Sequence, residues 1–213
     1  MSDIDVIQAP NFADLDWLDH GFGLRDSAIP SGIRTLKQIH SGIVLDAASP
    51  ATEGDALISD EAGVRLGVKT ADCVPILLVD PATPAVAAIH AGWRGSAENI
   101  AAAAVRQIAA RWKTRPENLR AAIGPSIGVC CYEVGPEVAN RFERWIPVSK
   151  DRHLDLPAIN EIQLRAAGVT NIWKSGECTF CGAERFFSFR REREQAGRMM
   201  SFIGLQKHVG RTA

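Results

Sequence analysis

Short apolar runs recur along the chain, separated by polar segments that contain glycine or proline, and they predict its strands. Several runs are apolar at consecutive positions, which is typical of strands covered on both faces of a sheet. All of them are far too short to cross a bilayer. We expect strands at "IRTLKQIH" (33–40), "VRLGVKT" (64–70), "PILLVD" (75–80), "AVAAIH" (85–90), "LRAAIG" (119–124), "VTNIWKS" (169–175), "RFFSFR" (185–190) and "MMSFIGL" (199–205).

A longer segment, "SAENIAAAAVRQIAARW" (96–112), has the periodicity of an amphipathic helix. Ile100, Ala104 and Ile108 fall on one apolar stripe, which we expect to face the core. Ser96 belongs to the residue types that cap helix N-termini, so the helix is expected to begin there.

Two further helices are predicted at 136–145 and 157–168, each with a proline at its start. Strands and helices follow one another without a regular βαβ alternation, which disfavours a doubly wound fold. We therefore predict an α+β fold in which mixed β-sheets are flanked by helices. Without a repeat or a linker, the chain is most simply a single domain over residues 1–213.

Composition narrows the class of partner. The 213 residues are 46% hydrophobic, enough for a sizeable core, and the formal net charge is −1. This balance gives no electrostatic reason to expect nucleic acid or an anionic membrane as the main partner. The first residues show no basic segment followed by an apolar one, so we expect a cytoplasmic protein.

The chain has five cysteines, an odd number that argues against a disulfide framework and for thiols or metal ligands. Cys178 and Cys181 form a CxxC, which could bind zinc, carry redox chemistry or have no special role. A structural zinc would need two more ligands, and the adjacent Cys130 and Cys131 are poorly spaced to supply both. The favoured interpretation of the CxxC is therefore two reduced, buried thiols.

His40, Cys73 and His90 each stand at the end of a predicted strand or just beyond one. Imidazole and thiolate suit zinc, and three protein ligands leave a fourth position for water or substrate, as in catalytic sites. No short motif links the three residues, so each histidine could equally be a satisfied or surface imidazole.

A second interpretation pairs Cys73 with His90 as nucleophile and base. Cysteine hydrolases need the thiolate, and a neighbouring histidine lowers its pKa and relays protons. Asp72 would then orient or polarise this pair, or act as an acid or base itself.

Several arginines are candidates for binding phosphate. Arg94 stands in the glycine-rich turn "HAGWRGS" before the predicted 96–112 helix, where backbone amides and the helix N-terminus favour an anion. Arg190 and Arg191 in "FSFRRERE" are further candidates, whereas Arg193 is expected on the surface because charges alternate in sign around it.

The loop "GPSIGVCCYEVGP" (124–136) combines three glycines and two prolines with two cysteines, a tyrosine and a glutamate. Such a rigid loop with many functional groups is more often part of a site than idle, although a plain structural turn would also account for it.

A set of motifs follows in order along most of the chain: "LKQIHSGIV", "GDALIS", "GVKTADCVPILLVD", "AAIHAGWRGS", "AAIGPSIGVCCYEVGPEV" and "ERFFSFRRE…GRMMSFIGL". Together these motifs resemble the laccase-domain (multicopper polyphenol oxidase) family. Members of this family are described as purine nucleoside phosphorylases with adenosine deaminase and methylthioadenosine phosphorylase activities.

The resemblance implies that His40, Cys73 and His90 bind a single zinc, or less convincingly copper. It implies a site that also takes purine nucleosides (inosine, adenosine and methylthioadenosine) together with phosphate. The implied fold is related to the deamidase domain of cytotoxic necrotizing factor.

Three other functions remain open. Some members of the family are described as peptidoglycan-editing factors, which would suit an amidase that uses Cys73 and His90. Copper polyphenol oxidation fits less well, because several copper centres need many histidines and the chain has five in all. A non-enzymatic protein with a structural zinc is least favoured, because three ligands leave a site open.

Overall fold

The computed structural model describes residues 5–146 and 152–207. Strands β7 (Val74–Asp80) and β8 (Ala85–Ala91) lie at the centre of the fold, and every residue in both is buried. They are antiparallel neighbours, with Pro75 opposite His90. Their consecutive apolar positions are explained by cover on both faces, as the sequence predicts.

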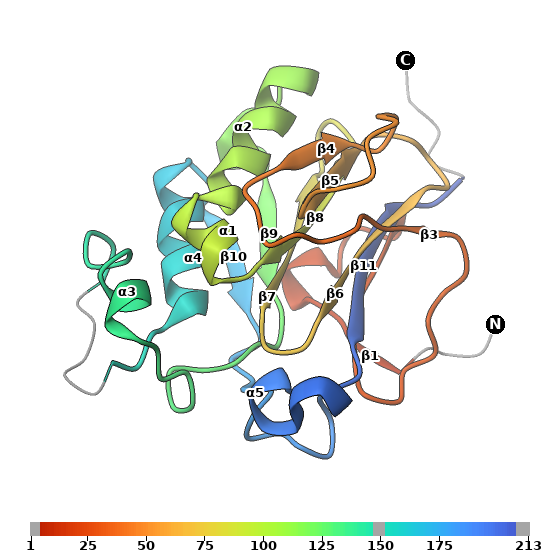
Figure 1. Ribbon diagram of the computed structural model, residues 1–213. Coiled ribbons are helices and arrows are strands. Elements are labelled where there is room, and N and C mark those ends of the chain that lie inside the picture. Colours follow the sequence, from red (N-terminus) through yellow and green to blue (C-terminus); the bar gives the residue numbers. More distant parts are fainter. Residues whose placement is uncertain (1–4, 147–151, 208–213) are drawn as a thin grey trace.

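The central strands belong to a six-stranded mixed sheet, and a five-stranded mixed sheet packs against one of its faces (Figure 1). In spatial order the first is β10 (Asn171–Lys174), β9 (Arg120–Ile123), β7, β8, β5 (Ala56–Ser59) and β4 (Val44–Asp46). The second is β1 (Val6–Ile7), β2 (Leu18–Gly23), β11 (Met199–Leu205), β6 (Arg65–Thr70) and β3 (Ile33–Arg34).

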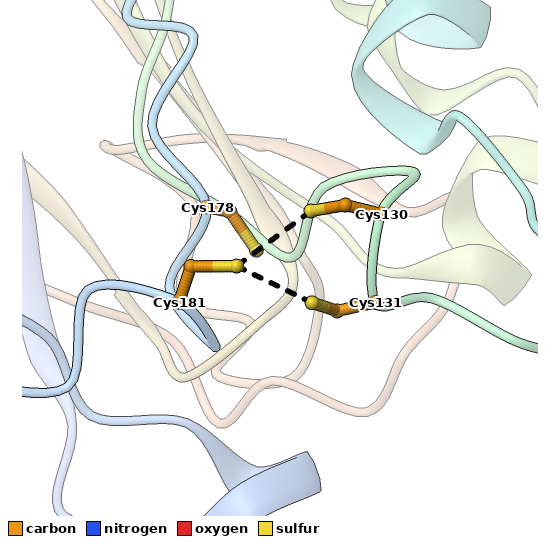
Figure 2. Close-up of side chains that lie close together, drawn as sticks. All are labelled: Cys130, Cys131, Cys178 and Cys181. Atoms are coloured by element: carbon orange, nitrogen blue, oxygen red, sulfur yellow. Dashed lines mark hydrogen bonds between the residues drawn. The ribbon is translucent and has the colours of Figure 1, made fainter.

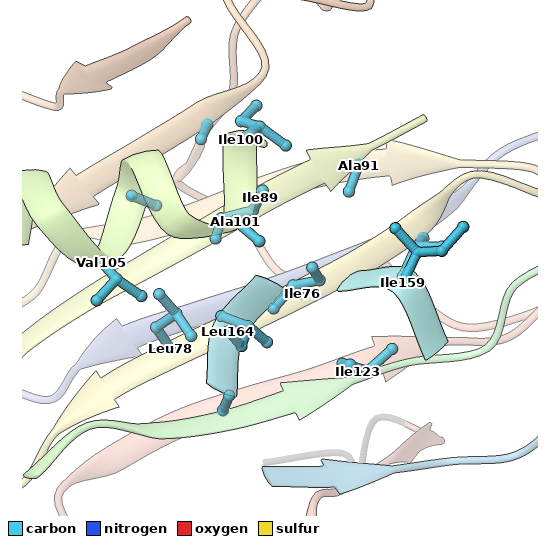
Figure 3. Packing of buried hydrophobic residues seen from close by; sticks show 14 of the residues in the cluster. Ile76, Leu78, Ile89, Ala91, Ile100, Ala101, Val105, Ile123, Ile159 and Leu164 are labelled. Atoms are coloured by element: carbon cyan, nitrogen blue, oxygen red, sulfur yellow. The ribbon is translucent and has the colours of Figure 1, made fainter. Parts of the chain in front are cut away.

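Helices cover the other face of the six-stranded sheet. The two longest are α2 (Ile100–Trp112) and α4 (Leu156–Ala166). Their apolar side chains form one buried cluster with the outward face of the sheet, seen in Figure 3 for Ile76, Leu78, Ile89, Val105 and Leu164. The remaining helical segments are α1 (Trp93–Ala97), α3 (Pro136–Ala139), α5 (Phe189–Glu192), η1 (Pro10–Phe12), η2 (Pro116–Asn118) and η3 (Arg193–Gln195).

The predicted α+β class with mixed sheets and flanking helices is confirmed, because parallel and antiparallel pairs occur in both sheets. Among the described residues, no helix combines the length and the apolar character needed to cross a membrane. The relation to the necrotizing factor deamidase stays a prediction.

Two of the predicted strands are wrong. The segment 33–40 is a strand only at Ile33–Arg34, and it then runs irregularly to His40, whose φ of 59° is left-handed. The segment 185–190 contains no strand and leads into α5. Leu36 in the first segment and Phe189 in the second line a cavity instead of pairing in a sheet, so apolar character alone misled the prediction.

The predicted helix at 96–112 is broken. Asn99 adopts a left-handed φ of 62°, so α1 ends before it and α2 begins after it. Ser96 therefore does not cap the helix; it lies buried inside α1, where its Oγ accepts a hydrogen bond from Nδ2 of Asn160 at 2.9 Å.

Of the other two predicted helices, 157–168 is confirmed as α4, whereas regular helix within 136–145 covers only Pro136–Ala139 before a series of turns. Strands β1, β2, β4 and β5 are absent from the prediction. Their segments are short or contain glycine, histidine and aspartate, and the partner strands supply the missing stabilisation.

Candidate active site

His40, Cys73 and His90 lie together, as predicted. One donor atom of each is within 4.8 Å of the other two, and Sγ of Cys73 is 4.0 Å from Nε2 of His40. The β7–β8 pairing brings the start of β7 beside the end of β8, which places Cys73 next to His90. His40 approaches from the irregular segment after β3 and is exposed.

Asp55, which the sequence interpretation missed, holds two of these ligands. Its Oδ1 accepts a hydrogen bond from Nδ1 of His90 at 2.7 Å, and in the neutral ring this contact selects the tautomer whose Nε2 has a free lone pair for a metal. The carboxylate also accepts the backbone N–H groups of His40 at 3.0 Å and Ser41 at 2.7 Å. Asp55 is 1% exposed, so these donors replace water around its charge.

The donor set fits a zinc ion. For tetrahedral zinc with ordinary bond lengths, sulfur and nitrogen ligands are about 3.6 Å apart, close to the separation of Cys73 and His40. Gly92 leaves room beside them: a Cβ at this position would lie 3.1 Å from Sγ of Cys73 and 3.1 Å from Cδ2 of His40. A larger residue would therefore crowd the space in front of the ligands.

Electrostatics prepare the thiolate for a metal. Burial raises the pKa of Cys73, but hydrogen bonds and charge from His40 and His90 outweigh it and bring the pKa to about 6. Burial also opposes ionisation of Asp55, but hydrogen bonds from His90 and Ser41 lower its pKa to about 2. Cys73 and Asp55 are thus both anions at neutral pH. Burial opposes the charged form of His90, but contacts with Asp55 and Cys73 outweigh burial and raise its pKa to about 9, so a metal ion must displace a proton from His90.

The three ligands form part of the wall of a cavity of about 700 Å³, a volume typical of small-molecule sites. Its wall combines aromatic rings with basic side chains. The aromatic residues are Trp93, Tyr132 and Phe189, and the basic ones are Lys37, Lys69, Arg190, Arg193 and Arg198.

The basic wall is largely uncompensated. Within residues 5–146 and 152–207, Lys69, Arg193 and Arg198 form no ion pair with a carboxylate. Lys37 is paired with Glu53 at 2.7 Å. Among the described residues, the one carboxylate on the cavity wall belongs to Asp72. The cavity therefore favours an anionic ligand.

Asp72 lies on the wall, but both of its carboxylate oxygens already accept hydrogen bonds. Oδ1 accepts the hydroxyl of Thr179 at 2.7 Å, and Oδ2 accepts the backbone N–H of Arg190 at 2.6 Å. Its φ of 88° is left-handed, so these contacts hold a strained turn between β6 and β7. The geometry favours positioning of Arg190 over proton transfer by Asp72.

The arginines are distributed differently from the sequence prediction. Arg190 and Arg193 line the cavity, and Arg193 is exposed, as the sequence predicts, so it stands on the part of the wall that meets the surface. Arg94 is exposed, lies over the ring of Trp93 at 5.0 Å and is not part of the cavity wall. Arg191 donates to the main-chain carbonyls of the CxxC loop, with Nη1 at 2.8 Å from Thr179 O.

The prediction for the loop 124–136 stands, since Ile127 and Tyr132 line the cavity. The other cysteines are free thiols, as predicted, but Cys178 and Cys181 are not buried, and the expectation that Cys130 and Cys131 are poorly spaced to join them is wrong. Cys130, Cys131, Cys178 and Cys181 form a second cluster of donor atoms, because the chain folds the two loops side by side. The adjacent positions of Cys130 and Cys131 in the sequence did not reveal the cluster, since it depends on a contact between segments that are distant in the chain.

The missed residues left weak signals. Asp55 is a lone carboxylate at the start of an apolar segment, where a buried charge needs specific partners. Lys69 and Trp93 lie within the motifs that contain Cys73 and His90, but the sequence does not tell on which side of the backbone their side chains lie.

Comparison with known proteins gives the family. A family model described as "Multi-copper polyphenol oxidoreductase laccase" matches residues 24–206. A purine nucleoside phosphorylase from Deinococcus radiodurans is 41% identical over 184 residues, which cover 83% of this chain and 72% of the relative. Adenosine deaminase RL5, from an unknown prokaryotic organism, is 40% identical over 176 residues, covering 76% and 66% respectively.

The fold has a counterpart among solved structures. The crystal structure of YlmD from Geobacillus stearothermophilus superposes with a TM-score of 0.83 at 32% identity, covering 93% of this chain and 94% of that one. The family model and these relatives cover most of the chain, and the range matched by the family model includes His40, Cys73 and His90. The chain belongs to the multi-copper polyphenol oxidoreductase laccase family.

Proposed function

We propose that the cavity is the active site of a zinc-dependent purine nucleoside phosphorylase that acts on inosine, adenosine and methylthioadenosine, with adenosine deaminase as a second activity. The observation that carries this proposal is the cavity itself, in which a thiolate–imidazole trio stands beside aromatic rings and unpaired cations. The names of the relatives support it. A cytoplasmic location is part of the proposal.

The aromatic residues suit the purine. A flat, weakly polar base gains from stacking against aromatic side chains, and such contacts accept different purines because each has a π-face. Trp93 and Tyr132 come from separate elements and are both partly buried, so the rings are held by the surrounding structure.

The basic residues suit phosphate. In phosphorolysis, phosphate takes the place of the base at C1′ through a transition state with oxocarbenium character, and the departing purine must be protonated or its charge stabilised. Lys69, Arg193 and Arg198 supply positive charge without a competing carboxylate. In this proposal Arg190 also contacts phosphate. Asp72 holds its backbone N–H, and its guanidinium donates to Glu133 O at 3.0 Å. Arg94 and Arg191 take no part in binding phosphate.

Tyr132 is our candidate for assisting the leaving base. Burial raises the pKa of Tyr132, and the neighbouring Cys73 thiolate raises it further. Its hydroxyl therefore stays protonated at neutral pH and can donate a hydrogen bond to the departing purine.

The metal ligands serve the deaminase activity in this proposal. When zinc is bound, it supplies a Lewis acid with an open fourth position, the chemistry that activates water for attack on adenine. Asp55 keeps His90 oriented as a ligand, and Cys73 contributes a thiolate. Copper would also accept these donors, but a single trio of ligands does not make the several centres that multicopper oxidation requires.

One observation favours a second candidate, a cysteine hydrolase or amidase with a peptidoglycan-editing role. Asp55, His90 and Cys73 follow one another as orienting carboxylate, base and low-pKa thiol, which is the arrangement of a nucleophilic triad. The same geometry would suit a metal-ligating histidine and its supporting carboxylate, so an activity assay must distinguish the two candidate functions.

The test is an assay with metal analysis. Purified protein is incubated with inosine, adenosine and methylthioadenosine, with and without phosphate, and the released bases and inosine are separated by chromatography. Base release that requires phosphate, and deamination that disappears in His40→Ala together with the zinc of this site, support the proposal. Hydrolysis of an amide substrate that survives full zinc removal but is lost in Cys73→Ala would replace it with the hydrolase.

A further inference from the structure

Four cysteines outside the active site converge on one point. The Sγ atoms of Cys130, Cys131, Cys178 and Cys181 all lie within 4.8 Å of one another. Figure 2 shows the four side chains pointing inward from two loops. Sγ of Cys181 is 3.8 Å from that of Cys130 and 3.4 Å from that of Cys131. Sulfur atoms around a tetrahedral zinc are about 3.8 Å apart, so these separations match such a shell.

The two loops are held together by their backbones. The loop that carries the CxxC runs beside the loop after β9, with the N–H of Thr179 donating to Ser126 O at 3.0 Å. Within the second loop, the N–H of Cys131 donates to Gly128 O at 3.0 Å, which closes a tight turn. The convergence of the cysteines is therefore fixed by main-chain contacts as well as by the side chains.

Backbone amides also point at the sulfur of Cys178. The N–H of Gly128 donates to it at 3.2 Å. Such N–H···S contacts stabilise thiolate ligands in metal–sulfur sites.

The close packing of the two loops requires a glycine at position 128. A Cβ at Gly128 would lie 3.2 Å from Cβ of Cys178 and 3.3 Å from Sγ of Cys130. Both distances are tighter than ordinary contacts, so a side chain here would push the loops apart.

A positive charge stands behind the CxxC. Nη1 of Arg191 donates to the carbonyls of Thr179 at 2.8 Å and Phe180 at 2.6 Å, the two residues between the cysteines. A zinc ion with four thiolates carries a net negative charge, which a nearby guanidinium offsets. This gives Arg191, which does not line the substrate cavity, a structural role.

From this geometry we propose that Cys130, Cys131, Cys178 and Cys181 bind a second, structural zinc ion. Four protein thiolates complete a tetrahedral shell, which leaves no position for water or substrate and distinguishes this site from the His40–Cys73–His90 trio. Soft thiolates select zinc among the common divalent ions. The inference does not depend on the reaction proposed above.

The zinc would brace the wall of the active site. Cys131 adjoins Tyr132, which lines the cavity, and Thr179 of the CxxC donates its hydroxyl to Asp72, which in turn holds the backbone of Arg190. Joining the two loops through one ion would therefore fix Tyr132 on one loop and, through Thr179 on the other, Asp72.

Zinc analysis of the full chain, purified without chelator, tests the proposal. The wild type should carry two zinc ions, one for each group of donors. Cys181→Ser should lose one of them and keep the other, and the double variant His40→Ala/His90→Ala should show the opposite loss. A Cys181→Ser protein with the same zinc content as the wild type would overturn the proposal.

Cobalt binding gives an independent readout that does not require the cysteine variant to fold. In the metal-free His40→Ala/His90→Ala protein, Co²⁺ should produce the sulfur-to-cobalt charge-transfer bands and the intense visible absorption of a tetrahedral tetrathiolate. Absence of these bands would overturn the proposal. So would an intact mass of the native protein lower by two or four hydrogens, because the cysteines would then be paired as disulfides.

Discussion

Oδ1 of Asp55 lies 2.7 Å from Nδ1 of His90, and the same carboxylate receives the backbone of the segment that carries His40. One buried side chain, from the residue just before β5, thus orients two of the three ligands of the active-site trio. The arrangement joins metal binding to the packing of the central sheet, because the N–H of His90 also donates to Asp55 O at 2.7 Å.

Asp55→Asn should weaken zinc binding at the trio by about 10- to 100-fold, the usual cost of losing a carboxylate that orients a metal-ligating histidine. The amide keeps the shape but places N–H donors against the donors that the carboxylate accepts, so we also expect a loss of about 1–3 kcal/mol in the free energy of unfolding. Zinc affinity is measured by chelator competition, and stability by urea titration.

Ser41→Ala is the matched control. It removes the hydroxyl that donates to Asp55 at 2.7 Å but leaves the contact between Asp55 and His90 in place. Zinc affinity in Ser41→Ala should stay close to that of the wild type. Equal zinc affinity in Asp55→Asn and the wild type would contradict the role given to Asp55.

The sequence predicts the centre of the fold well, and it also predicts that His40, Cys73 and His90 lie together. Strands β7 and β8 are apolar throughout and have no alternative to a covered sheet, and Cys73 and His90 flank them within one antiparallel pair. The sequence identified His40 as a candidate ligand although the strand predicted around it is wrong. The identification rests on the motif that contains His40 and does not require a strand at this position.

Other features depend on contacts between distant segments, which local patterns do not encode. The break at Asn99 is stabilised by α4, from which Asn160 reaches Ser96, so the helical periodicity of the local sequence was overruled. The cysteine cluster needs two loops about fifty residues apart in the chain to lie side by side. Whether Arg94 or Arg193 faces the cavity depends on the turn of the backbone at each position.

Removing a cation from the cavity wall should raise the KM for phosphate. Lys69 forms no ion pair in the described part of the chain, so Lys69→Gln removes charge without freeing a buried carboxylate. A lost hydrogen bond to a charged group costs about 1.5–3 kcal/mol, which corresponds to roughly a 10- to 100-fold increase in KM. Steady-state kinetics at varied phosphate and saturating nucleoside give the value.

The variant Arg94→Gln tests whether Arg94 binds phosphate, as the sequence predicts, or takes no part in binding it, as the structure indicates. Arg94 is exposed and lies outside the cavity, so its loss should change the KM for phosphate by less than about twofold, as is usual for surface changes. An effect as large as that of Lys69→Gln would restore Arg94 as the phosphate ligand.

Tyr132→Phe should reduce kcat for phosphorolysis by about a hundredfold, the lower range for loss of a positioned proton donor. The ring remains, so the KM for nucleoside should change little, and the zinc content should not change. Single-turnover measurement of base release checks the chemical step. A variant with wild-type kcat would remove the hydroxyl from the mechanism and leave Tyr132 as a stacking residue.

Stability should fall in mild acid because of His20, a buried residue of β2. Its Nε2 accepts the backbone N–H of Ala9 at 3.0 Å, which requires the neutral ring. Burial lowers the pKa of His20, and the opposing effect of Asp19 is smaller. The unfolded chain therefore binds the proton more readily than the folded one.

The sign follows from that difference. The contribution of His20 to folding is complete above the unfolded pKa of about 6.5 and is lost as the pH falls through the lower folded pKa. One proton limits the slope to about 1.4 kcal/mol per pH unit. His20→Gln offers Oε1 as an acceptor to Ala9 but does not titrate, so its free energy of unfolding, measured with urea between about pH 7.5 and about pH 5, should fall less steeply than that of the wild type. Parallel slopes for the two proteins would show that other groups cause the acid sensitivity.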